Sequence, residues 1–307
     1  MVMARAIERR VWLLHRTGHA EASLHAGGSE AVQVAAAAVL RPGVDWVVPR
    51  PLDLALCLAM GLSPLDVLLA VFGRAADPAS AGRAEPGSFS SRSARIVSTS
   101  AGAGAHAIHA AGIAYASKLR GLDEVTLLST DARGAGSGDW HEGVNFAAVH
   151  RLPVVCIVID ANDGAIAPLA QPEADSFVRK SYGYGLAGAV VDGGDFDAAF
   201  ASLNQAAERA RSGQGPTVVH APVRPLSALN ASGVLQAPEQ LEAGSRQDPI
   251  GLMRQKLLGL RLLDDETELR IQADCLSVVS QEVERARASA SPRPAAALEN
   301  VVYRTDA

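Results

Sequence analysis

The sequence is poor in the residues that mark several large classes of protein. Aromatic residues make up only 4% of the 307 residues while 48% are hydrophobic, so a core must be built from Ala, Val, Leu and Ile. The three cysteines, Cys57, Cys156 and Cys275, lie far apart and have no metal-binding spacing. This cysteine usage is typical of a reducing compartment.

The sequence also has no excess of basic residues and no long apolar run. Its 28 Lys and Arg face 33 Asp and Glu, which gives a net charge of −5. Binding to a phosphate backbone needs basic surface, so we expect no nucleic-acid partner. The longest apolar run, AVQVAAAAVL, is too short to span a bilayer, and the first residues contain no apolar run of signal-peptide length. We therefore expect a soluble, cytoplasmic protein with no membrane partner.

The middle of the chain alternates between predicted strands and helices. Five stretches with apolar runs read as strands, namely RIVST, EVTLLST, PVVCIVID, AGAVVDG and GPTVVHAPV. Helices are predicted at 106–119, at 139–150 with Gly138 and Asp139 as its cap, and at 196–211. Continuous Val and Ile runs separated by helices indicate an α/β fold with a parallel sheet that has helices on both faces.

The two ends of the chain are predicted to lie outside this pattern. Before it come helices at 4–15, at 28–40 with Ser29 as a cap, at 52–60 and at 64–72, and then a connector rich in Gly, Ser, Pro and Ala over 75–94. After it we expect a loop over 226–246, helices at 249–260 and 266–287, and an extended tail from SASPRPAA. We place an α/β domain at 1–225 and a C-terminal helical extension, with loop and tail, at 226–307.

Eight segments in order carry a resemblance to a known family. They include GGSEAVQVA, RPGVDWVVPRPLDLALCLAMG, HAIHAAGIAYASKL, GSGDWHEGVNFAAVHRLPVV and YGLAGAVVDGGD, followed by AAERARSGQGPTVV, QDPIGLM and ALENVVY. From about Val11 to Tyr303 the chain resembles the α subunit of the first, decarboxylating component of 2-oxo acid dehydrogenase complexes, the branched-chain type most of all. The resemblance implies a thiamine-diphosphate-binding fold.

The resemblance also implies an activity, a cofactor and partners. Members of the family bind thiamine diphosphate through Mg²⁺ between an α and a β subunit, decarboxylate a 2-oxo acid oxidatively and pass the acyl group to a lipoyl group. We therefore expect a β subunit in a heterotetramer, or a homodimer, and contact with a lipoyl acyltransferase core.

The family's metal motif is altered in this sequence. The family has Gly-Asp-Gly after one strand, and an ungapped alignment puts Asp131, Ala132 and Arg133 there. Alanine cannot bind a metal, whereas a slip by one residue makes Asp131 the acid. After the next strand the family has an asparagine pair, and in ANDGAI the second asparagine is kept as Asn162, with the Gly164 carbonyl as the main-chain ligand.

Other positions of the family's site also differ. A Tyr-Arg pair that binds phosphate is replaced by Pro51 and Leu52, which leaves Arg50 as a neighbouring cation. Ala103 stands where a larger residue supports the bent cofactor, and VRPLSALNASGVLQ lacks the histidine of the family's acylation loop. We assign no catalytic residue. The predicted metal ligands are Asp131, Asn162 and Gly164, and the predicted cofactor-binding residues are these three with Arg50, Ala103, Ala132, Arg133 and Gly134.

Each of these residues also has a structural interpretation. Asn162 can satisfy a turn, Asp131 can cap the end of its strand, and Arg133 and Arg50 can be solvated instead of binding a phosphate. His141 and Glu142 are interpreted as structural residues of a helix near subunit contacts.

Two further features were weighed in the same way. His106 and His109 are interpreted as polar residues that open a helix. The stretch GAGSG lacks the third glycine and the following acid of a dinucleotide-binding loop, which excludes that function.

Three functions remain compatible with the sequence. The first is an active decarboxylase in which Asp131 takes the metal position. The second is an inactive pseudoenzyme subunit that stabilises or regulates a partner. The third is a binding protein whose cleft takes another ligand.

Overall fold

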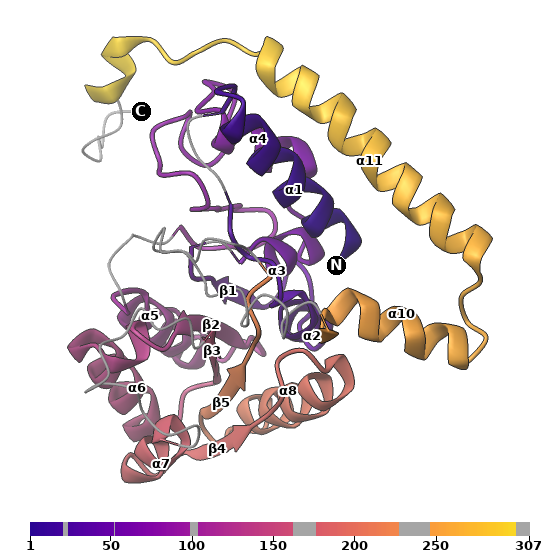
Figure 1. Cartoon of the computed structure of the whole chain (residues 1–307). Coiled ribbons are helices and arrows are strands. Elements are labelled where there is room, and N and C mark those ends of the chain that lie inside the picture. Colours follow the sequence, from indigo (N-terminus) through magenta and orange to yellow (C-terminus); the bar gives the residue numbers. More distant parts are fainter. Residues whose placement is uncertain (21–23, 52, 99–103, 162–175, 227–245, 299–307) are drawn as a thin grey trace.

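A five-stranded, all-parallel sheet forms the centre of the structure (Figure 1). The structure is a computed structural model and describes residues 1–20, 24–51, 53–98, 104–161, 176–226 and 246–298. The strand order is β1-β2-β3-β5-β4. The strands are β1 (Trp46–Val48), β2 (Thr126–Asp131), β3 (Val154–Asp160), β4 (Ala187–Val190) and β5 (Thr217–Pro222). This arrangement confirms the predicted α/β class with a parallel sheet.

Both faces of the sheet are apolar and both are covered by helices. On β3, Val155 and Ile157 belong to one buried hydrophobic cluster, and Cys156 and Val158 belong to the other. Successive side chains of a strand point to opposite faces, so a strand with no polar position needs cover on both. One face carries α5 (His106–Leu119), α6 (Gly138–Val149) and α7 (Ser176–Gly183), and the other carries α2 (Glu30–Ala38) and α8 (Phe196–Arg211) (Figure 1).

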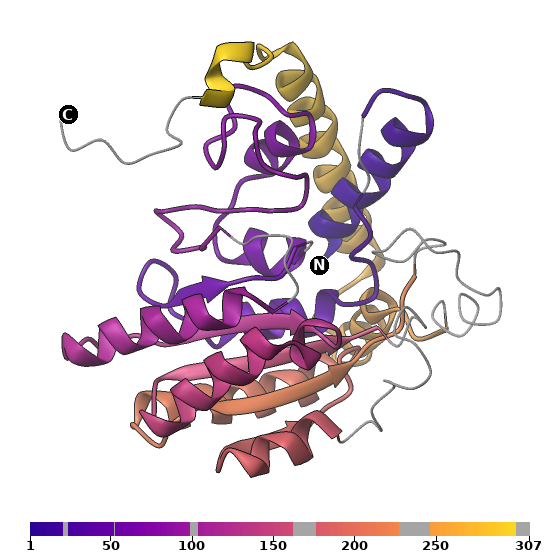
Figure 2. The same cartoon turned by 90° about the vertical axis from the view of Figure 1, so that its left-hand side faces the viewer.

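The remaining helices lie beyond the α2 side of the sheet (Figure 2). They are α1 (Val2–Arg16), α3 (Leu54–Ala59), α4 (Pro64–Val71), α10 (Pro249–Gly259) and α11 (Asp265–Ala288). The second half of α11 contributes Val279, Val283 and Ala286 to the core and packs on α4 and α1. The two long C-terminal helices of the predicted extension are therefore confirmed.

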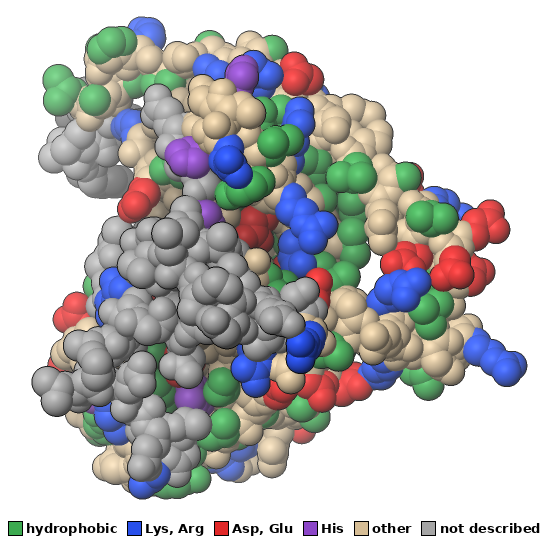
Figure 3. Space-filling view, viewed as in Figure 1, with side chains coloured by type: hydrophobic (Ala, Val, Ile, Leu, Met, Phe, Trp, Pro, Cys, Tyr) green, Lys and Arg blue, Asp and Glu red, His purple; other side chains and the backbone are tan. Residues whose placement is uncertain are grey.

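The first half of α11 projects from the body together with α10. Every residue of 269–274 is exposed, and Leu269 and Ile271 are 67% and 41% accessible. We call α10 and 265–274 the arm. A gap separates the arm from the body in the space-filling view, and apolar and charged side chains alternate along it (Figure 3). Its base is fixed by Arg5 of α1, whose two terminal nitrogens donate to Asp248 at 3.1 Å each.

One predicted strand is wrong. In residues 95–98, the part of RIVST that the structure describes, only isolated bridges form, in which Ile96 pairs with Val47 and Ser91, and the edge strand of the sheet is β1 instead. The reason is local, because Arg95 adopts a φ of +53° and turns the chain just before Ile96.

Helix starts and two short elements also differ from the predictions. The cap of α6 is Ser137, whose Oγ accepts from the Trp140 N–H at 3.2 Å, rather than Gly138 and Asp139. Ser29 lies at the start of α2, but its hydroxyl donates to the Ala26 carbonyl instead of capping the helix. Helix α7 was not predicted, and Pro294–Leu298 forms a short 3-10 helix where an extended tail was expected.

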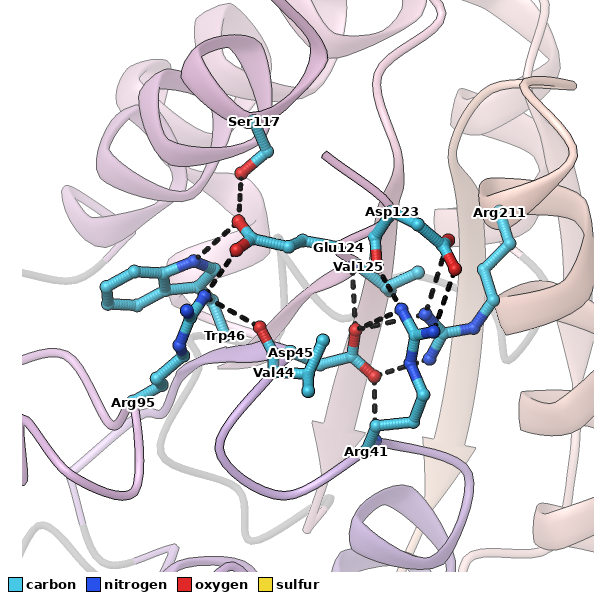
Figure 4. Close-up of polar contacts among 10 residues, drawn as sticks. All are labelled: Arg41, Val44, Asp45, Trp46, Arg95, Ser117, Asp123, Glu124, Val125 and Arg211. Atoms are coloured by element: carbon cyan, nitrogen blue, oxygen red, sulfur yellow. Dashed lines mark hydrogen bonds and ion pairs between the residues drawn. The ribbon is translucent and has the colours of Figure 1, made fainter. Parts of the chain in front are cut away.

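A network of charged side chains closes the amino edge of the sheet (Figure 4). The fully buried Asp45, just before β1, accepts from the Arg41 and Val125 N–H groups at 2.7 and 2.9 Å and from both terminal nitrogens of Arg211 of α8. Beside it, Glu124 accepts from Arg95, Ser117 and Trp46. The network joins β1, β2, α5 and α8 at the edge opposite to the predicted cofactor residues.

Candidate functional site

Several of the predicted site residues lie at the carboxyl ends of the strands, along one edge of the sheet. Arg50 follows β1, Asp131 ends β2, and Asp160 ends β3 just before Ala161. All strands are parallel, so these ends lie on the same side, and this edge is where open α/β sheets bind ligands. Three of the predicted positions, Ala103, Asn162 and Gly164, lie outside the described residues, as does Leu52.

Asp131 is exposed at the end of β2 and holds the turn that follows. Its Oδ1 accepts from the Gly134 N–H at 2.6 Å. Asp131 thus has the turn role considered for it, which leaves its second oxygen to bind other groups. The next residue, Ala132, is buried in the hydrophobic cluster under α5 and α6, and Arg133 is exposed. At this turn the exposed acid is therefore residue 131, while position 132 belongs to the core.

The turn packs tightly against the start of α5 through two glycines. A Cβ on Gly134 would lie 2.2 Å from the Thr130 hydroxyl, and one on Gly104 would lie 2.0 Å from the Ser137 hydroxyl. Gly104 also has a φ of +80°, which side chains rarely tolerate. Ser137 Oγ donates to the Gly134 carbonyl at 2.7 Å. The 134–137 turn and the α5 start therefore form one closely fitted unit.

Arg50 is held by a buried carboxylate. Its Nε donates to Asp53 Oδ1 at 2.7 Å, and its backbone N–H donates to Oδ2 at 3.0 Å. Asp53 is fully buried, while the Arg50 side chain keeps 16% of its surface accessible. The guanidinium is thus partly neutralised by its own chain, which weakens it as a phosphate ligand.

His106, the first residue of α5, lies within the same edge. Its Nε2 is 2.8 Å from the Ser129 carbonyl oxygen on β2, and only 3% of the residue is exposed. Burial lowers the pKa of His106, and the Ser129 carbonyl and the carboxylates of Asp53 and Asp131 oppose this only in part. The ring is therefore neutral at pH 7. Its position confirms the helix-opening role and adds a contact to β2 that the sequence did not predict.

Two buried polar atoms at this edge have no hydrogen-bond partner among the described residues. They are Nδ1 of His106 and Oγ of Ser129. Buried polar groups are almost always paired in folded proteins, by protein, water or ligand. Each of the two atoms is therefore a position at which a water molecule or a ligand can complete the hydrogen bonding.

A second pair, missed in the sequence, links β3 and β5. Nε2 of the buried His220 lies 3.2 Å from Asp160 Oδ2, and the Phe177 ring packs edge-on against the imidazole. A histidine inside an apolar strand was the only signal for this contact in the sequence. The pair fixes the carboxylate at the last residue before Ala161.

No ready-made metal site is present in the described part of the chain. Among those residues no three His, Cys, Asp or Glu side chains cluster closely enough to hold an ion. His141 and Glu142 do not join the edge cluster; His141 instead bonds to the Tyr184 hydroxyl. None of the described helices is long and apolar enough to cross a membrane.

Comparison with known proteins relates these features to one family. Residues 1–295 match the family model described as the dehydrogenase E1 component. The 2-oxoisovalerate dehydrogenase subunit alpha of Bacillus subtilis is 32% identical over 305 residues, which cover 98% of this chain and 92% of that protein. The 3-methyl-2-oxobutanoate dehydrogenase subunit alpha of Mycobacterium tuberculosis is 31% identical, with 92% of this chain and 75% of that protein covered.

A solved structure extends the comparison to the fold. The transketolase of Campylobacter jejuni superposes with a TM-score of 0.57 at 15% identity, over 93% of this chain and 47% of that chain. This chain thus spans about half of the transketolase, and the likeness concerns the fold alone, which confirms the predicted thiamine-diphosphate-binding fold. From the family match and these relatives, the chain belongs to the dehydrogenase E1 component family.

Proposed function

We propose that this chain is the α subunit of a thiamine-diphosphate-dependent dehydrogenase for branched-chain 2-oxo acids, which acts with a β subunit. The complete enzyme decarboxylates the 2-oxo acid oxidatively and transfers the acyl group to the lipoyl group of an acyltransferase core. The family match and the two α-subunit relatives support the reaction class. Thiamine diphosphate, when bound, supplies the nucleophilic carbon and the electron sink for this decarboxylation.

The observation that carries the proposal is the arrangement at the end of β2. The carboxylate of Asp131 is exposed, and among the described residues only its Oδ1 is engaged, by the Gly134 N–H. An exposed carboxylate at the carboxyl edge of a parallel sheet fits a hard cation and the charged ligand that accompanies it. The described residues therefore fit thiamine diphosphate and its cation at this edge, although they do not complete a metal site.

The predicted ligands keep their roles within this proposal. Asp131 would bind Mg²⁺ together with Asn162 and the Gly164 carbonyl, and the turn at Gly134 would lie beside the phosphates. Arg50 and Arg133 would line the diphosphate side, and Ala132 and Ala103 would contribute only small apolar surface. The exposure of Asp131 and the burial of Ala132 support the alignment with a one-residue slip. Within this chain, the predicted α/β domain at 1–225 would carry all of these residues, and the predicted extension at 226–307 would carry none of them.

Calorimetric titration tests the proposal directly. Thiamine diphosphate and Mg²⁺ are titrated into the chain alone and into the chain with its β subunit. We expect weak binding to the chain alone and tight, Mg²⁺-dependent binding to the pair, because one carboxylate cannot hold the cation by itself. Absence of binding in both settings would contradict the proposal.

Asp131 provides the sharpest variant. Replacing Asp131 by Ala removes the exposed carboxylate, so we expect Mg²⁺-dependent cofactor affinity to fall on the order of 100-fold or more. The matched control is Asp139→Ala, which removes an exposed acid from the first turn of α6. Equal affinities for the Asp131 variant, the control and the unmodified chain would exclude Asp131 as a metal ligand.

A second function, a pseudoenzyme subunit that supports a partner, is favoured by one specific observation. Position 132, where the ungapped alignment puts the metal-binding acid of the family, carries a buried alanine. In that case the chain would assemble as a homodimer or with a β subunit without binding cofactor. Stable co-purification with the β subunit, combined with no cofactor binding and no decarboxylation of any branched-chain 2-oxo acid, would select this function.

A further inference from the structure

Nδ1 of His106 is a buried hydrogen-bond acceptor that the proposed function does not yet use. Nε2 of the same ring contacts the Ser129 carbonyl oxygen, which can only accept, so Nε2 carries the hydrogen. In the neutral ring Nδ1 is therefore a bare lone pair. It is buried and has no partner among the described residues. A buried acceptor without a donor costs free energy, which a bound group would recover.

The charges around the ring decide which kind of donor suits it. The carboxylates of Asp53, at the start of α3, and of Asp131, at the end of β2, both act on His106, and the nearby exposed His109 acts in the opposite direction. Arg50 is already paired with Asp53. Two carboxylates favour a donor that carries positive charge, such as the water of a hydrated cation, over an anionic group.

The bond that Nε2 makes has a further consequence. Ring nitrogens that serve a metal site usually have the opposite nitrogen donating to a backbone carbonyl, which fixes the tautomer and the ring orientation. His106 has this arrangement through Ser129, at the strand that ends in Asp131. The ring orientation and the tautomer that make Nδ1 an acceptor are therefore fixed by the fold of the chain.

We propose that Nδ1 of His106 accepts a hydrogen bond from a water molecule of the divalent cation that enters with the diphosphate, and that His106 is thus a positioning residue of the cofactor site. Mg²⁺ in proteins keeps several of its waters, so such a donor is available. Nδ1 is enclosed in this structure, so the proposed contact requires that the start of α5 move when the cation enters. The inference rests on the proposed function.

The first experiment compares two histidines of one helix. In His106→Gln the amide NH₂ can still donate to the Ser129 carbonyl, while the Nδ1 lone pair is lost from its position in the ring. In His109→Gln an exposed histidine one turn along is changed as the control. With the β subunit present, we expect the dissociation constant for Mg²⁺ and thiamine diphosphate to rise about tenfold or more in His106→Gln and to stay unchanged in His109→Gln. Both variants should keep the melting temperature of the unmodified chain.

Two probes locate the contact on the cofactor. Mg²⁺ with inorganic pyrophosphate carries the cation without the thiamine part, and unphosphorylated thiamine carries neither cation nor phosphate. We expect the loss in His106→Gln with Mg²⁺-pyrophosphate as well as with the full cofactor. A loss seen with the full cofactor but not with Mg²⁺-pyrophosphate would overturn the assignment to the cation.

A spectroscopic measurement observes Nδ1 of His106 directly and does not need the His106→Gln variant. In the ¹⁵N spectrum of histidine-labelled chain with its β subunit, we expect Nδ1 of His106 to resonate as an unprotonated nitrogen and to move upfield on addition of Mg²⁺-pyrophosphate. An unmoved resonance in a complex that binds the probe would overturn the inference and leave the proposed function standing. No binding by the unmodified complex would overturn both.

Proton counting separates an acceptor from a donor. If Nδ1 stays an acceptor, the calorimetric enthalpy in buffers of different ionisation enthalpy should give the same proton uptake for the unmodified chain and for His106→Gln. Uptake of one proton that disappears in His106→Gln would mean that the ring becomes a cation and donates to the phosphate. That result would overturn the proposed role.

Discussion

Glu8 is buried on α1 against the turn that precedes α2. Its Oε1 accepts from the Ala26 and Gly27 N–H groups at 3.1 Å each. Burial, reinforced by the carboxylate of Glu30, raises the pKa of Glu8 to about 7, although the two N–H groups and Arg5 act against the shift. The carboxyl therefore changes its charge near neutral pH, inside the contact between α1 and the helix that follows it.

The sign of the resulting pH dependence follows from the raised pKa. The folded chain holds the Glu8 proton up to about pH 7, whereas the unfolded chain releases it near the ordinary value of 4.5. Glu8 therefore lowers the free energy of unfolding progressively as the pH rises from 4.5 to 7, and its penalty is complete above pH 7. A shift of this size corresponds to roughly 3 kcal/mol as an upper figure.

Replacing Glu8 by Gln should remove this pH dependence. The amide keeps an acceptor for the two N–H groups but cannot ionise, so we expect the variant to be more stable than the unmodified chain at pH 8 and similar to it at pH 4.5. Urea unfolding at both pH values measures the difference. Glu284→Gln, at a side chain that is 69% exposed, is the control and should change neither value. An identical slope with pH in all three chains would refute the prediction.

At the scale of elements, Ser137 connects a helix cap to the candidate site. Its Oγ accepts from the Trp140 N–H at the start of α6 and donates to the Gly134 carbonyl in the turn. One hydroxyl thus fixes both the helix start and the turn that Asp131 holds.

Loss of this hydroxyl should destabilise the chain measurably. For Ser137→Ala we expect the free energy of unfolding to fall by about 1–2 kcal/mol, because the cap bond and the turn bond are lost together. Ser212→Ala, which removes an exposed hydroxyl after α8, should stay within about 0.5 kcal/mol of the unmodified chain. Chemical denaturation of both variants and of the unmodified chain measures these free energies of unfolding. If Ser137→Ala is as stable as the unmodified chain, the two hydrogen bonds of Ser137 do not contribute to stability.

The elements show why some predictions succeeded and others did not. The bounds of α5 and α8 were predicted to the residue, since each has a long apolar pattern and, for α8, a capping Asp195. Strand β1 has only three residues and was missed because such a segment is ordered by its pairing with β2 rather than by its own pattern. Helix α7, which has eight residues, was missed as well.

In the candidate site, too, some features could be predicted from the sequence and others could not. Asp131 and Gly134 could be placed from the sequence, because a turn after a buried strand is a local signal. The pairing of Arg50 with the buried Asp53 could not be predicted, and neither could the Nδ1 of His106 that has no partner among the described residues. Both features depend on which segments of the chain come together in the fold. Burial of a polar atom is a tertiary property that no spacing in the chain reveals.

For the whole molecule, the network at Asp45 joins four elements across the amino edge of the sheet. Burial by itself would raise the pKa of Asp45, but the hydrogen bonds from Arg211, Arg41 and Val125 hold it below its ordinary value. A carboxyl with a lowered pKa stabilises the fold above the unfolded-state pKa, and this contribution is lost as the pH falls through the folded-state value. The network should therefore open in acid, below about pH 4.

Replacing Asp45 by Asn tests this network. The change leaves the partly buried Arg211 with only the exposed Asp123, at 3.9 Å, as an acidic partner, so we expect a loss of roughly 3 kcal/mol at pH 7 that shrinks towards pH 3. Asp123→Asn is a control from the same network, because Asp123 also contacts Arg41 but its side chain is 68% exposed; it should cost less than about 1 kcal/mol. Thermal unfolding from pH 7 to pH 3 measures both, and equal losses for the two variants would refute the prediction.

The strand order also governs how the chain is assembled during synthesis. Strand β5 lies between β3 and β4, although both precede it in the chain. Until Thr217–Pro222 has left the ribosome, the VVCIVID segment of β3 has one hydrogen-bonding edge without its native neighbour. An apolar strand with an open edge is prone to pair with other chains. The nascent chain is therefore most in need of chaperones while the stretch between β3 and β5 is being translated.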